Sequence, residues 1–169
     1  MSTIQPGRMT ATHRGPLVIF VIGMRINHFH KVGKWLPVIR AMGPMVEELS
    51  RDKDSGFLGT ETMLQGVRTI LLLQYWRDFD SLEAYARARE HKHWPAWTAF
   101  NKAIGNDGTV GIFHETYVVP EHGSETVYAN MVPFGLGKVS GVVPATGSRN
   151  EARSRMKSIA EEIGPSRSG

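Results

Sequence analysis

Two histidines, His93 and His114, are the side chains in this sequence best suited to acid–base chemistry. His93 lies between two helical patterns, and His114 lies within an otherwise apolar run. Imidazole titrates near neutral pH and binds iron, so either residue is a candidate general base or axial haem ligand. A solvent-facing helix cap is the structural alternative for His93. For His114 the alternative is a core histidine whose hydrogen bonds are satisfied.

Aromatic side chains near these histidines are candidates for substrate binding. Stacking and apolar burial in a pocket would hold a flat aromatic ligand or a haem. Asn27 is a polar candidate at the end of the first predicted strand. The substrate-binding candidates are Asn27, Trp76, Trp97, Phe100 and Tyr117. Core packing explains most of the aromatic residues equally well, and a turn explains Asn27.

Metal and nucleotide cofactors are not expected from the motifs. The pairs His28/His30 and His91/His93 have a spacing that converges only on a strand, and no third ligand lies nearby in the sequence. The absence of cysteine excludes disulfides, thiolate nucleophiles and iron–sulfur sites. No phosphate-binding loop and no dinucleotide fingerprint follows a predicted strand. We therefore expect no metal ion and no tightly bound nucleotide.

The elements that position these residues follow the order strand, helix, strand, strand, helix, strand. The expected strands are Leu17–Ile26, Phe57–Leu64, Thr69–Trp76, Val110–Val119 and Glu125–Val132. Helical spacing begins at Trp35, at Ser81 with Asp80 as its cap, and at Pro95. This order is the split βαβ of an α+β, ferredoxin-like fold with one extra C-terminal strand.

One face of such a sheet carries no helices, although the strands are apolar on both faces. We expect a second copy of the chain to cover it, giving a homodimer, with the extra strand adding to the partner's sheet edge. Glu115 lies on the opposite face from His114 because side chains alternate along a strand. Glu115 is therefore expected to contact the dimer partner.

Composition divides the chain into a flexible arm (1–15), a ferredoxin-like domain (16–137) and a polar, partly helical appendage (138–169). The first apolar run is too short to span a bilayer and no cleavage site follows it, which predicts a cytoplasmic protein without membrane contact. The basic residues before Glu47 do not gather on a reading helix, so nucleic acid is not an expected partner.

Several long strings resemble the dimeric α+β barrel superfamily, and within it a monooxygenase-like family with a relative in fumagillin biosynthesis. These strings are FVIGMRINHFHKVGKWLPV (20–38), QYWRDFDSLEAYAR (74–87), HWPAWTAFN (93–101), GIFHETYVV (111–119) and VYANMVPFGLG (127–137). The resemblance places Trp76 and His93 at pocket positions of the superfamily, and leaves open whether His91 is the true equivalent. Some relatives place a substrate-orienting Asn where Asn27 stands.

The resemblance implies a dimeric enzyme of the monooxygenase-like type that acts on a small aromatic or polyketide-like substrate without a tightly bound cofactor. His93 or His114 would deprotonate the substrate, and the carbanion would react with oxygen in a dry pocket. The first alternative is a haem-binding protein or haem enzyme, of the aldoxime dehydratase or haem-degrading type, with His93 or His114 as axial ligand. The second is a non-catalytic ligand-binding dimer.

Overall fold

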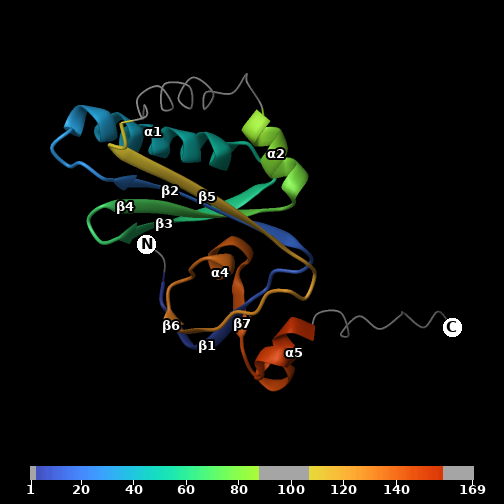
Figure 1. The fold of residues 1–169 in the computed structure, drawn as a ribbon. Helices are drawn as coiled ribbons and strands as arrows, with labels where there is room; N and C mark the ends of the chain where they lie inside the picture. The colour runs from blue at the N-terminus through green and yellow to red at the C-terminus, as the bar shows by residue number, and fades with distance from the viewer. Residues whose placement is uncertain (1–2, 88–106, 158–169) are drawn as a thin grey trace. The chain divides into compact units, whose positions relative to one another are not determined.

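The computed structural model describes residues 3–87 and 107–157, which belong to two compact units. One unit is Val18–Val118 and holds the elements of the ferredoxin-like prediction (Figure 1). The other unit combines the two ends of the chain, Met1–Leu17 and Val119–Gly169. No helix in the described ranges is long and apolar enough to cross a membrane.

The first unit is built on a four-stranded antiparallel sheet with the order β3-β4-β2-β5. Its strands are β2 (Leu17–Ile26), β3 (Phe57–Gln65), β4 (Thr69–Trp76) and β5 (Val110–Val119). The helix α1 (Val32–Arg51) connects β2 to β3, which are not neighbours because β4 lies between them. That arrangement is the split βαβ, so the predicted ferredoxin-like α+β fold is confirmed.

The helices α1 and α2 (Phe79–Arg87) lie on one face of this sheet, here called the inner face (Figure 1). The register of β2 with β4 pairs Val18 with Trp76 and Met24 with Ile70, so alternate residues of both strands point to this face. Two buried clusters join the face to the helices. They contain Val18, Leu49, Trp76 and Leu82, and Met24, Ile26, Val38 and Val110.

The cap of α2 differs from its prediction. The helix begins at Phe79 rather than Ser81, and the Asp78 carboxylate accepts a 2.6 Å hydrogen bond from the Ser81 backbone N–H. Asp78 therefore caps the helix in place of Asp80, because it is the carboxylate three residues before an open backbone donor. Hydrogen bonds from Ser81 and Arg77 hold the pKa of Asp78 at about 2.

The second unit has a three-stranded sheet with the order β6-β1-β7. Its elements are β1 (Gln5–Ala11), β6 (Tyr128–Met131), α4 (Leu136–Ser140), β7 (Val142–Pro144), a 3-10 turn (Gly147–Arg149) and α5 (Ala152–Lys157). Residues 5–11, expected within a flexible arm, are the central strand of this sheet. Residues 142–144, expected within an appendage, pair with it.

The extra strand predicted at 125–132 exists in shorter form as β6, and it pairs with β1 of its own chain. One side of β6 is at the edge of this sheet, so its addition to a partner's sheet edge stays a prediction. Polar side chains reinforce the pairing: Gly7 N–H donates 2.8 Å to Asn130 Oδ1, and Thr126 Oγ1 accepts at 2.9 Å from the Ala11 N–H. Such contacts leave no apolar period in the sequence, which is why β1 went unpredicted.

Candidate active site

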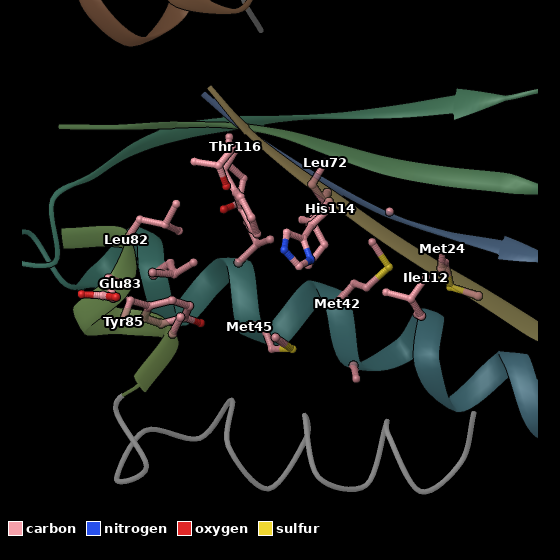
Figure 2. A pocket seen from close by; sticks show the side chains of 18 of the residues that line it. Met24, Met42, Met45, Leu72, Leu82, Glu83, Tyr85, Ile112, His114 and Thr116 are labelled. Carbon is pink, nitrogen blue, oxygen red and sulfur yellow. The ribbon is translucent and has the colours of Figure 1, made fainter. Parts of the chain in front are cut away.

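A cavity of about 420 Å³ lies between the inner face of the sheet and the helices α1 and α2 (Figure 2). Its wall is mostly aliphatic and thioether carbon, including Met42 and Met45 from α1, Leu72 from β4 and Ile112 from β5. The volume falls within the range of small-molecule sites, and such sites are mainly apolar with a few polar groups that orient the ligand.

His114 is the titratable ring on the sheet side of the cavity. It comes from β5 and points toward the α1 methionines in Figure 2. Its ring centroid lies 5.7 Å from that of Phe20 on β2, at an interplanar angle of 42°. Neither ring nitrogen hydrogen-bonds to another residue in the described part of the chain. Both nitrogens are therefore available to a ligand.

Gln74 on β4 also lines the cavity, and its side chain is tied to Trp76. The Trp76 indole Nε1–H donates a 3.0 Å hydrogen bond to Gln74 Oε1. Trp76 itself is fully buried, packed edge-on against Phe57 at 5.3 Å and tilted against Tyr85 at 5.6 Å between ring centroids. Gln74 is thus the polar group of β4 that faces the cavity, and Trp76 is the anchor behind it.

Two ionisable side chains of α2, and Thr116 of β5, add to the polar lining. Glu83 pairs with Arg87 at 2.7 Å, so its charge is partly balanced. Burial raises the pKa of the Tyr85 phenol, and the negative charge of Glu48 raises it further. The Tyr85 hydroxyl therefore stays protonated at neutral pH, and its oxygen is buried, so other atoms of Tyr85 form its part of the cavity lining.

The predicted site residues separate into five groups in the structure, of which Tyr117 forms one by itself. His114 lines the cavity, whereas Trp76 lies behind its lining. Asn27 caps the end of β2, where its Nδ2 donates 2.9 Å to the Gly108 carbonyl, away from the lining residues. His93, Trp97 and Phe100, together with His91, fall outside the described residues.

Tyr117 does not share a wall with His114. The two residues are three apart on β5, so they point to opposite faces of the sheet. The Tyr117 hydroxyl instead donates a hydrogen bond to the Glu115 carboxylate, and that interaction raises the pKa of Tyr117. The expectation that Tyr117 and His114 line one pocket is therefore corrected by the two-residue period of the strand.

Sequence reasoning missed Gln74 and Tyr85 as lining residues. The sequence does contain a signal for Gln74. It lies two residues from both Leu72 and Trp76, so it shares their face of the strand, and it is the polar side chain among these apolar ones. The helical spacing places Tyr85 on the buried side of its helix, and Trp76 is the residue predicted to line the pocket. Separating them requires the direction of each ring, which the spacing of α2 and β4 does not give.

Known proteins resemble this chain in both sequence and fold. The model of the family described as Monooxygenase af470-like matches residues 17–136. The monooxygenase af470 of Aspergillus fumigatus is 30% identical over 159 residues, which cover 82% of this chain and 56% of that protein. The chain thus spans little more than half the length of this relative.

Solved structures extend the likeness of the fold. A crystal structure of an aldoxime dehydratase matches with a TM-score of 0.53 and 14% identity, over 90% of this chain and 44% of that one. SnoaB, a cofactor-independent oxygenase from Streptomyces nogalater, matches with a TM-score of 0.41 and 14% identity, over 60% of this chain and 90% of that one. With the family model spanning the strands and helices that enclose the cavity, the chain belongs to the monooxygenase af470-like family.

Proposed function

We propose that this chain is a monooxygenase that inserts oxygen into a small, conjugated phenolic or polyketide-like substrate, with His114 as the general base. The observation that carries this proposal is the His114 ring, which faces an apolar cavity with both nitrogens unengaged by other described residues. The name of the Aspergillus relative, monooxygenase af470, supports the same reaction class.

The chemistry begins with the transfer of a proton from an activated carbon to the His114 imidazole. The resulting carbanion forms a carbon–oxygen bond with dioxygen, and the O–O bond of the peroxide then breaks as a second C–H proton is lost. An activated CH2 group and O2 thereby become a ketone and water, with no external reductant. The wall offers an apolar surface to the ligand, but His114 and Thr116 are exposed in the protomer, so the bound substrate itself must cover them to keep water from reprotonating the carbanion.

The described residues fit a haem less well than they fit this chemistry. His114 offers an axial nitrogen, but a haem also carries two propionates that need cationic partners. Among the described lining residues the charged side chain is Glu83, which would repel them. No cluster of three or more metal-ligating side chains occurs within 3–87 and 107–157. We therefore derive no step through haem, and titration with haemin is the direct check on His114 as an axial ligand.

A second copy of the chain is part of the proposal. Phe113 and Tyr117, which point away from the cavity, are 37% and 51% exposed. Large apolar side chains on a sheet face are commonly covered by a partner. Light scattering should give the mass of a dimer, whereas a stable monomer would contradict this part of the proposal.

Anthrone, a fused aromatic ketone with an acidic CH2, is a suitable probe for the proposed reaction. With labelled dioxygen, the wild type should consume oxygen and place one labelled atom in the ketone product. His114→Ala should lower kcat/KM by roughly 10²- to 10⁴-fold, as expected for loss of a general base. His30→Ala is the matched control, because His30 is exposed and outside the lining residues.

Two outcomes would overturn the proposal. Turnover by His114→Ala at the wild-type rate would remove His114 from the base role. Binding of anthrone and related phenols by the wild type without oxygen uptake would favour the non-catalytic, ligand-binding alternative.

A further inference from the structure

We infer that Gln74 is a second substrate-contacting residue, which donates a hydrogen bond from its amide Nε2 to an oxygen of the substrate, and that Trp76 fixes the direction of this donor. The inference deepens the proposed function, because it states what the substrate must carry besides an acidic proton. It rests on the described cavity and on one hydrogen bond within its wall.

The orientation of the Gln74 amide follows from the chemistry of its partner. An indole N–H can only donate, so the amide atom 3.0 Å from Trp76 Nε1 must be the oxygen. The usual ambiguity between amide oxygen and nitrogen is thereby removed. The NH2 group is the other end of the same planar amide, and no other described residue hydrogen-bonds to it.

The position of the Gln74 N–H in the cavity wall gives it an effect on ligand affinity. Gln74 is 6% exposed and belongs to the residues that line the cavity. The Nε2 atom is not among the fully buried, unpaired polar atoms of the described residues, so it can meet solvent in the cavity, and a ligand that covers it gains affinity by supplying an oxygen acceptor. A ligand without such an oxygen would leave the donor unpaired, and the cavity would discriminate against it.

Gln74 and His114 occupy the two ends of one row of side chains. Gln74 lies directly opposite Phe20 in the pairing of β4 with β2, and the Phe20 ring lies 5.7 Å from the His114 ring. With strands about 4.8 Å apart, the two outer members are separated by roughly 10 Å at the backbone. A flat ligand over Phe20 therefore meets a hydrogen-bond donor at one end and a base at the other.

This row selects a substrate by the distance between two functional groups. When His114 removes a proton at one end of a conjugated system, negative charge moves to an oxygen at the far end. A donor already directed at that oxygen stabilises the charge as it develops. The chemical class is therefore a planar conjugated ketone or phenol whose acceptor oxygen lies across the ring system from its acidic position.

Trp76 acts through Gln74 and is a positioning residue. Its indole is fully buried and packed by Phe57 and Tyr85, so the Nε1–H has one direction. Trp76→Phe would keep the aromatic packing and release the amide, which could then turn its oxygen toward the ligand.

The test uses 9-fluorenone, a planar ketone without an acidic hydrogen, so that binding is measured apart from turnover. Gln74→Leu should weaken fluorenone binding about tenfold, the effect of one buried hydrogen bond. Gln74→Glu keeps the acceptor for Trp76 but replaces the donor with a carboxylate, and should weaken binding at least as much. Trp76→Phe should weaken it by a smaller factor.

A spectroscopic signature separates hydrogen bonding from a merely structural role. The carbonyl stretching frequency of bound fluorenone should be lower in the wild type than in Gln74→Leu. Gln65→Glu is the matched control, because Gln65 ends β3, is exposed and lies outside the lining. It should leave both affinity and frequency unchanged. Circular dichroism and thermal melting establish that each variant is folded.

The outcomes distinguish this inference from the proposed function. Wild-type fluorenone affinity and carbonyl frequency in both Gln74 variants would overturn the inference, even if His114→Ala still abolished oxygenation. Gln74-dependent fluorenone binding in a wild-type protein that oxygenates none of the probes would support the donor and overturn the monooxygenase reaction.

Discussion

Two hydrogen-bonded side-chain pairs in this sheet have the same spacing in the sequence but differ in burial. Gln74 and Trp76 on β4, and Glu115 and Tyr117 on β5, are each two residues apart, and a side-chain hydrogen bond joins each pair. The β4 pair is buried on the inner face and leaves an amide N–H for a ligand. The β5 pair lies on the opposite face, where Tyr117 is 51% exposed.

The difference teaches that spacing alone does not create a site. A separation of two residues places side chains on the same face of a strand, which explains both hydrogen bonds. Burial decides whether such a bond stabilises the fold and directs a donor, or simply exchanges with water at the surface. The following predictions test that contrast.

The largest difference between the pairs should appear on truncation of the aromatic partner. Trp76→Ala should lower the free energy of unfolding by about 3–5 kcal/mol, because a fully buried indole leaves a cavity in the core. Tyr117→Ala should cost far less within one protomer, because Tyr117 is 51% exposed there, and any further loss should depend on protein concentration, as expected for a residue covered by the proposed dimer partner. Urea denaturation of both variants measures the contrast, and equal losses would show that the two faces are not different.

A smaller difference is expected when the acceptors are removed. Gln74→Leu should cost about 1–3 kcal/mol, because it leaves the buried Trp76 N–H without an acceptor. Glu115→Leu removes the acceptor of a hydroxyl that is exposed in the protomer, so thermal melting at a protein concentration low enough to give monomers should show little change. A stable Gln74→Leu variant would mean that Trp76 finds another acceptor.

The smallest effect concerns ionisation on the exposed pair. The Glu115 carboxylate raises the pKa of Tyr117, because it accepts a hydrogen bond from the phenol O–H and repels the phenolate. Glu115→Gln should therefore move the Tyr117 pKa down toward its ordinary value of about 10. Spectrophotometric titration, with Tyr117→Phe subtracted to identify the signal, measures the shift. An unchanged pKa would exclude the hydrogen bond in solution.

Long apolar strands were the predictable part of the fold. The bounds expected for Leu17–Ile26, Thr69–Trp76 and Val110–Val119 agree with β2, β4 and β5. The first two are largely apolar runs, and Pro16 and Pro120 mark the start of β2 and the end of β5. The strand β1 contains Pro6 and Gly7 and has little alternation, and its pairing depends on distant residues near 130 and 143. Local pattern carries no information about that pairing.

The candidate site was partly predictable for a similar reason. His114 was found because a titratable residue interrupts an apolar strand. Tyr117 was predicted to share a pocket wall with His114, although the strand period that separates Glu115 from His114 separates Tyr117 from it as well. Gln74 was missed because its role depends on the rotamer of Trp76, and a rotamer in a packed core is set by contacts between segments far apart in the sequence.

The position of β5 at one edge of the four-stranded sheet has a consequence for motion. An edge strand is paired on one side only, so its amide hydrogens should exchange with solvent through smaller local openings than those of the central strand β4. The Phe113 ring opposes such opening, because it occupies the space above Gly23 where a Cβ atom would lie 2.6 Å away. The backbone amide of His114 on β5 should therefore exchange its hydrogen with solvent faster than the backbone amide of Gln74 on β4.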